Sequence, residues 1–109
     1  DVPNTAKNFV SLADSGFYDG TRSHRLIKGF MLQMGDPNTK DPNLESRWGT
    51  GGPGYGIDCE FQGAGKQENK PGTLSMAHAG LNTGGSQFFI NHGNNGFLNN
   101  KHTVFGQLV

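Results

Sequence analysis

The sequence predicts a mainly β fold, an antiparallel barrel or sandwich of short strands accompanied by one helix. Three observations point to this class. Glycine accounts for 18 of the 109 residues without a collagen-like period, which indicates many turns rather than long helices. Short runs rich in β-branched and aromatic residues recur between turn residues. Only one segment, near the start, has apolar residues at clear helical spacing.

The predicted helix comes first. Asp1 is suited to cap it, Pro3 to its first turn and Gly16 to its end. The apolar residues at helical spacing are Ala6, Phe9, Val10 and Ala13. Because this stripe is narrow, we expect the helix to lie on the surface of a larger core.

Four regions after the helix predict strands. Residues 23–34 should form two strands separated near Lys28 and Gly29, and the other strands are expected within 73–77, 86–91 and 103–109. Asp-Pro-Asn and glycine dominate residues 35–56, which predicts a long loop of the kind that is usually functional. Residues 63–66 are expected to form a turn, and 92–100 a polar loop.

Size and charge restrict the function. At 109 residues the chain fits a single domain, and its formal charge of zero offers no basic surface for nucleic acid or an anionic membrane. No stretch reaches the roughly 20 apolar residues that cross a bilayer. The single Cys59 cannot form an internal disulfide. The chain begins with Asp1 rather than Met, so we expect it to be cut at both ends, and cytoplasmic and periplasmic locations both stay open.

Motifs for metal or cofactor chemistry fail on inspection. Residues 49–54 spell the dinucleotide pattern Gly-x-Gly-x-x-Gly, but Pro53 and its neighbouring glycines exclude the helix that this pattern requires. The acidic loop beginning at Asp36 lacks the glycine that a calcium loop needs at its sixth position. The histidines have no zinc spacing, and Ser86 does not lie in a nucleophile elbow. We therefore expect no metal and no cofactor.

Four segments resemble the cyclophilin family in order and spacing. They are HRLIKGFMLQ at 24–33, LSMAHAG at 74–80, NTGGSQFFI at 82–90 and FLNNKHTVFG at 97–106. The resemblance implies an eight-stranded antiparallel barrel capped by helices, with a peptide groove on its outer face and peptidyl-prolyl cis-trans isomerase activity. Two strands before the helix, and a helix and a strand after Val109, have no counterpart in the chain. We therefore expect residues 1–109 to form one cyclophilin-like domain with an incomplete barrel.

The resemblance also implies the site residues. Arg25 matches the catalytic arginine. The remaining positions match groups that bind substrate: Phe30, Met31, Phe89 and Leu98 in the proline pocket, Phe97 and His102 at its rim, Gln33 and Gln87 among the polar groups, and Ala77 with His78 in the stretch whose backbone pairs with the peptide. Taken singly, each residue type is more often structural, so the joint pattern carries the hypothesis.

The implied chemistry is rotation about an X-Pro bond, whose barrier is about 18–20 kcal/mol because amide resonance must be broken. In the twisted transition state the imide nitrogen regains its lone pair. Arg25, a permanent donor, can give that nitrogen a hydrogen bond that the planar ground state scarcely offers. One such bond is worth about 1.5–3 kcal/mol, so pocket and groove contacts must supply the rest. Activity should be flat from about pH 6 to 8.

Several positions depart from the family pattern: Ser23, Met34, His78 and Phe97. Phe97 stands where many eukaryotic members have tryptophan, which favours a bacterial-like member. It lacks an indole N–H donor, so we expect weaker binding of cyclosporin-like cyclic peptides. The expected partners are proline-containing peptides and unfolded proteins. Two rival hypotheses stay open: a module that binds proline peptides without catalysis, and an inert piece of a larger protein.

Overall fold

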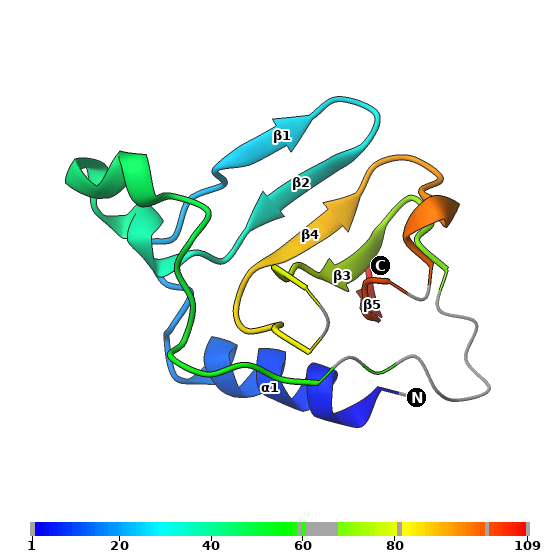
Figure 1. Cartoon of the computed structure of the whole chain (residues 1–109), viewed down its shortest axis with the longest axis horizontal. Helices are drawn as coiled ribbons and strands as arrows, with labels where there is room; N and C mark the ends of the chain where they lie inside the picture. Colours follow the sequence, from blue (N-terminus) through cyan, green and yellow to red (C-terminus); the bar gives the residue numbers. More distant parts are fainter. Residues whose placement is uncertain (1, 59, 61–67, 81, 100, 109) are drawn as a thin grey trace.

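The structure, a computed structural model, describes residues 2–58, 60, 68–80, 82–99 and 101–108 of the chain (Figure 1). In these residues it contains one α-helix, one antiparallel sheet and three short 3-10 helices. In chain order the elements are α1 (Pro3–Asp14), β1 (Arg25–Ile27), β2 (Met31–Met34), η1 (Pro37–Lys40), η2 (Pro42–Arg47), β3 (Thr73–Met76), β4 (Phe88–Asn91), η3 (Gly96–Leu98) and β5 (Val104–Gln107).

The sheet has the strand order β1-β2-β4-β3-β5, and each neighbouring pair is antiparallel. A tight turn joins β1 to β2, with Gly29 at φ +76° and the Phe30 N–H donating to the Ile27 carbonyl at 3.0 Å. In the part of the chain that the structure describes, β1 and β5 are the sheet edges and do not pair with each other. The prediction of a mainly β, antiparallel, incomplete barrel with one capping helix is confirmed.

Helix α1 lies against the sheet near β5, as Figure 1 shows. Phe9 joins it to the sheet: its ring centroid lies 5.2 Å from that of Phe88 on β4 and 5.2 Å from that of Phe105 on β5. The predicted helix and its first-turn proline are confirmed. Val10 and Ala13, predicted on the apolar stripe, are instead exposed, Val10 to 54%, because Thr5, Phe9 and Leu12 form the inward face.

The start of α1 is capped by a residue that lies far away in the sequence. Val2 occupies the N-cap position and supplies no side-chain cap, while Asp1, predicted for that role, lies outside the described residues. The Glu60 carboxylate instead accepts from the Thr5 N–H at 2.5 Å and from the Thr5 hydroxyl at 2.6 Å. A carboxylate at this end of a helix satisfies free N–H groups and complements the helix dipole.

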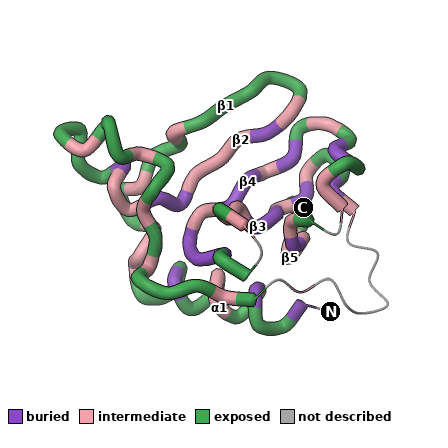
Figure 2. Tube along the Cα trace, in the orientation of Figure 1, coloured by how far each residue is buried: buried purple, intermediate pink, exposed green. Residues whose placement is uncertain are grey.

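Consecutive residues of β4 serve opposite faces of the sheet. Phe88 is buried toward α1, and Phe89, which is 4% exposed, belongs to the other face. This is the alternation that a strand imposes on its side chains. Figure 2 shows buried positions along β2, β4 and β3, while β1 is exposed along its length. The outer edge therefore carries its side chains next to solvent.

The long loop predicted at residues 35–56 folds into η1 and η2 followed by irregular backbone. Asp36 and Asp41 each precede a proline and cap one of these turns, accepting from Asn38 N–H at 2.8 Å and Asn43 N–H at 2.9 Å. The strands predicted within 73–77, 86–91 and 103–109 are confirmed as β3, β4 and β5 with shorter bounds. The turn predicted at 63–66 lies outside the described residues.

Candidate active site

The sheet register brings the catalytic candidate into line with the pocket. Arg25 on β1 pairs with Gln33 on β2, and Gln33 pairs with Phe89 on β4. Residues opposite one another in adjacent strands project from the same face, so these three side chains form one row across the sheet. Met31, two residues before Gln33, lies on the same face. Residues far apart in the sequence are therefore neighbours because of strand pairing.

Nine of the eleven predicted site residues line one pocket of about 300 Å³. They are Arg25, Phe30, Met31, Gln33, Ala77, His78, Phe89, Leu98 and His102. The volume is at the lower end of the range for small-molecule sites, the size for one ring rather than a large ligand. The apolar part combines Met31 and Phe89, which are 3% and 4% exposed, with Phe30 and Leu98.

The remaining two predicted residues lie beside this pocket. Phe97, 64% exposed on η3, stacks on Phe30 with ring centroids 5.8 Å apart, a rim position. Gln87 lines an adjoining hollow of about 540 Å³. Gln33, Ala77 and His78 line both spaces, so the pocket and the hollow form two parts of one groove.

Arg25 lies at the solvent-exposed edge of the pocket. Over the described residues the one ion pair joins Lys70 to Glu68, so no carboxylate there competes for the Arg25 guanidinium. An arginine without a partner in a pocket keeps its N–H donors available for a ligand.

Two stacked histidines, His78 and His102, also line the pocket. The His78 and His102 rings are 4.2 Å apart, and His102 also meets Phe89 edge-on at 5.3 Å. His102 Nδ1 donates to the Met76 carbonyl at 2.9 Å, which leaves Nε2 as an acceptor. Burial lowers the pKa of His102; the hydrogen bond to the Met76 carbonyl opposes this effect, and His78 and Lys101 lower the pKa a little further. A neutral His102 gives the pocket a polar but uncharged wall.

A chain of hydrogen bonds fixes the polar side of the groove. Gln33 Nε2 donates to Gln87 Oε1 at 3.0 Å, and Gln87 Nε2 donates to the Gly51 carbonyl at 2.8 Å. The fully buried Asp36 carboxylate then accepts from the Gly51 N–H at 3.2 Å and the Gly49 N–H at 2.5 Å. Asp36 thus anchors the glycine-rich loop to which the two glutamines are tied.

Asp36 and the loop at residues 49–53 were not among the predicted site residues. The loop at residues 35–56 was predicted to be functional as a whole, but no role for Asp36 or for the individual glycines followed from the calcium and dinucleotide patterns. The available signal was the Asp-Pro-Asn sequence, which is typical of a carboxylate that binds the backbone two residues on. Its further contacts, 13 and 15 residues away, are tertiary.

Among the described residues, no group of three or more His, Cys, Asp or Glu side chains could hold a metal ion. In the same residues no helix has the length and apolar character needed to cross a membrane.

Comparison with known proteins decides the family. The sequence model of the cyclophilin type peptidyl-prolyl cis-trans isomerase/CLD family matches residues 1–109. The chain belongs to the cyclophilin family. It is 53% identical over 107 residues to a peptidyl-prolyl cis-trans isomerase of Synechococcus elongatus, covering 98% of this chain and 66% of that protein. It is 51% identical over 108 residues to peptidyl-prolyl cis-trans isomerase B of Bacillus subtilis, covering 99% of this chain and 69% of that protein.

A solved cyclophilin has the same fold. The crystal structure of a cyclophilin type peptidyl-prolyl cis-trans isomerase of Cryptosporidium parvum, determined in the presence of the dipeptide Ala-Pro, matches with a TM-score of 0.83 and 39% identity. The match covers 99% of this chain and 66% of that one. The chain thus spans about two thirds of the length of these cyclophilins. The resemblance seen in the sequence is confirmed.

Proposed function

We propose that this cyclophilin chain carries a peptidyl-prolyl cis-trans isomerase site, with Arg25 as the catalytic residue. One observation carries the proposal: the Arg25 guanidinium and the apolar floor of Met31 and Phe89 line the same pocket. The apolar floor suits a proline ring, and the guanidinium suits the nitrogen of that ring. The names of the relatives support the same reaction.

The proposed mechanism requires no bond to be made or broken. The proline ring enters the pocket over Met31 and Phe89, while flanking residues of the peptide lie along the groove. Holding both sides confines rotation to the X-Pro bond. As the bond twists, Arg25 donates to the imide nitrogen, whose lone pair is available only then, so the interaction favours the transition state over the planar forms.

The proposed substrates are extended proline-containing segments of peptides and unfolded proteins. A pocket of about 300 Å³ next to a hollow of about 540 Å³ has room for the proline and for the residues beside it. Apart from Tyr55, His78 and the two glutamines, the residues that line the hollow are small, among them Gly51, Gly52 and Thr83. Such a lining sets few demands on the side chains of a peptide, which agrees with a broad substrate range and a role in protein folding.

Arg25→Ala in the full-length protein tests the mechanism. Loss of one charge-assisted hydrogen bond should lower kcat by about 10- to 100-fold, with the far-UV spectrum unchanged. Arg22→Ala is the matched control, because Arg22 is also exposed and lies outside the pocket residues. Turnover of Arg25→Ala equal to that of Arg22→Ala would eliminate the proposed role.

The alternative function is a module that binds proline peptides without catalysis. Exchange spectroscopy on an X-Pro peptide separates the two. An isomerase speeds interconversion of the cis and trans signals, whereas a pure binding module shifts the signals and leaves the exchange rate unchanged. The unpaired Arg25 at the pocket edge favours the isomerase, because a binding module needs no donor at the imide nitrogen.

Cyclosporin-like cyclic peptides are proposed as weak ligands. Phe97 offers an exposed ring at the pocket rim but no N–H donor. A metal, a nucleic acid and a membrane surface have no place in the proposed reaction.

A further inference from the structure

Behind the proline pocket lies a buried group of amides, which we call the asparagine cluster: Asn69, Asn91, Asn95 and Asn99. Asn69, Asn91 and Asn95 are 0%, 1% and 5% exposed. Asparagine is rarely so deeply buried, and each buried amide must find hydrogen-bond partners. The contacts of these side chains therefore show what the cluster holds together.

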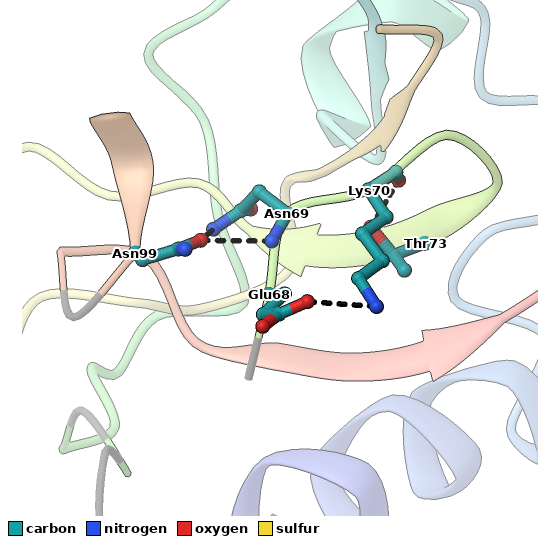
Figure 3. A network of polar contacts seen from close by, with 5 residues as sticks. All are labelled: Glu68, Asn69, Lys70, Thr73 and Asn99. Carbon is teal, nitrogen blue, oxygen red and sulfur yellow. Dashed lines mark hydrogen bonds and ion pairs between the residues drawn. The ribbon is translucent and has the colours of Figure 1, made fainter. Parts of the chain in front are cut away.

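The inner part of the cluster connects strands β3 and β4. Asn91 Nδ2 donates to Thr73 Oγ1 at 2.9 Å, to Ser75 Oγ at 3.1 Å and, at 3.3 Å, to Asn69 Oδ1. Figure 3 shows the outer part, where Asn69 reaches Asn99 just after η3: the Asn69 N–H and Nδ2 donate to Asn99 Oδ1 at 2.8 and 3.0 Å. The cluster thus spans from the sheet to the turn that carries Phe97 and Leu98.

Asn95 is the member that meets the pocket. Its Nδ2 donates to the Phe30 carbonyl at 2.9 Å and to Asn91 Oδ1 at 2.8 Å. Its own carbonyl accepts from the Leu98 N–H at 2.9 Å, and its N–H donates to the Asn69 carbonyl at 2.8 Å. One residue therefore links two pocket residues, Phe30 and Leu98, to the buried cluster.

The backbone around Asn95 leaves little freedom. The Phe30 carbonyl also accepts from the His92 N–H at 2.9 Å. A Cβ atom added at Gly93 would lie 2.2 Å from the Gly29 carbonyl oxygen, so the loop after β4 packs directly on the β1-β2 turn. These contacts hold Phe30 and Leu98, which belong to different segments and both line the pocket, in a fixed relative position.

We infer that Asn95 is a positioning residue that sets the separation of Phe30 and Leu98 and so the width of the proline pocket. The inference rests on the proposed function. Hydrogen bonds are directional, whereas apolar contacts tolerate sliding, so the bonds that Asn95 makes to the Phe30 carbonyl and the Leu98 N–H specify one relative position of these two residues. Asn95 lies behind the walls and acts through them.

Asn95→Ala in the full-length protein tests the inference, with Asn69→Ala as the matched control. Both remove a buried amide from the same cluster, but the Asn69 side chain contacts neither Phe30 nor Leu98. Pocket contacts grip the proline ring in the ground state and the transition state alike, so a looser pocket should raise KM about five- to tenfold and change kcat less than about twofold. Each variant is assayed at a temperature below its unfolding transition. Under these conditions, the KM of Asn69→Ala should stay within about twofold of the KM of the parent protein.

Equal KM values for Asn95→Ala and Asn69→Ala would overturn the inference. Asn95→Ser, a smaller disturbance, should give an intermediate KM, because its short hydroxyl can donate only one hydrogen bond. If Asn95→Ala does not fold, Asn95→Ser and amide exchange in the parent protein decide: a proline peptide should slow exchange of the His92 and Leu98 amides, and no slowing would contradict the inference.

The two proposals fail in different ways. A parent protein that binds the peptide without speeding isomerisation overturns the proposed function. The role of Asn95 is then read from the peptide Kd, which should rise about five- to tenfold in Asn95→Ala and stay within about twofold in Asn69→Ala. A parent protein that isomerises normally, with equal Kd and KM in both variants, overturns the positioning role alone.

Discussion

The two halves of the groove are built differently. The floor of the proline pocket stands on strands, where Met31, Gln33 and Phe89 are placed by the ladders between β2 and β4. The adjoining hollow has one wall made of loop, residues 49–53, whose position depends on the buried Asp36. A ladder distributes the positioning over many hydrogen bonds, whereas the loop depends mainly on one carboxylate and one glutamine amide. The strand-built floor of the pocket should therefore tolerate single changes that the loop wall of the hollow does not.

The halves meet at the two glutamines. Gln33 belongs to a strand and Gln87 precedes one, yet Gln87 also holds the loop through the Gly51 carbonyl. A disturbance of the loop can therefore reach the pocket through these side-chain amides. This arrangement makes the comparison testable, since each half can be disturbed separately.

Asp36→Ala should have the largest effect. It leaves the N–H groups of Asn38, Gly49 and Gly51 without their acceptor. Each unsatisfied buried donor costs about 1–3 kcal/mol, and partial access of water to the loop should bring the total loss of unfolding free energy to about 2–4 kcal/mol. Denaturant unfolding measures it. The dipeptide Ala-Pro should bind as before, while a longer proline peptide that enters the hollow should bind more weakly.

Asp41→Ala is the matched control. Asp41 also precedes Pro-Asn and caps a 3-10 helix, but it is exposed and accepts from the single Asn43 N–H. Its replacement should cost much less and leave both ligands unaffected. If Asp36→Ala weakens the binding of the dipeptide and of the longer peptide equally, the two halves of the groove are not independent.

The same contrast explains how far the sequence could predict the structure. The strands were predicted because turn residues bracket β-branched and aromatic runs, and the consecutive Phe88 and Phe89 necessarily project to opposite faces. Nine residues of the pocket followed from the family resemblance. The roles of Asp36 and Asn95 did not, because the partners that define these roles, the Gly49 and Gly51 N–H groups and the Phe30 carbonyl, are backbone groups of distant segments. Backbone N–H and carbonyl groups are the same at every residue, so no sequence pattern marks the partner.

Stability should fall as the pH drops below about 6.5, an effect smaller than that of Asp36→Ala. Burial is the main cause that lowers the pKa of both His102 and His24 in the folded protein. The unfolded chain therefore binds these protons more readily, so acid favours unfolding. The contribution is complete above about pH 6.5 and is lost as the pH falls through that value toward the folded pKa. Thermal unfolding between about pH 4.5 and 8 measures the dependence.

The variant His102→Gln tests whether His102, a pocket residue, contributes to this pH dependence of stability. A glutamine amide can still donate to the Met76 carbonyl but does not titrate, so the acid loss should shrink and the part due to His24 should remain. Above about pH 6.5, kcat/KM of the parent should stay flat, since an arginine side chain is a permanent cation and the lowered pKa of His102 keeps that ring neutral there. An unchanged stability profile in His102→Gln would contradict the assignment of this titration to the pocket.

Phe97→Trp should have the smallest effect, and it tests the rim rather than either half of the groove. Phe97 is 64% exposed and touches the pocket through its stacking on Phe30, so stability should change by less than about 0.5 kcal/mol. The indole adds one N–H donor, worth about 0.5–1.5 kcal/mol, which predicts about two- to tenfold tighter binding of a cyclosporin-like cyclic peptide by calorimetry. Phe97→Leu, which keeps an apolar rim without a ring, should bind the cyclic peptide no better than the parent.

Because the proline ring sits over Met31 and Phe89 in the proposed mechanism, turnover of a proline peptide should change less than about twofold in both variants. A large loss of turnover in Phe97→Leu would instead place the stacked Phe30 and Phe97 rings among the groups that hold the substrate.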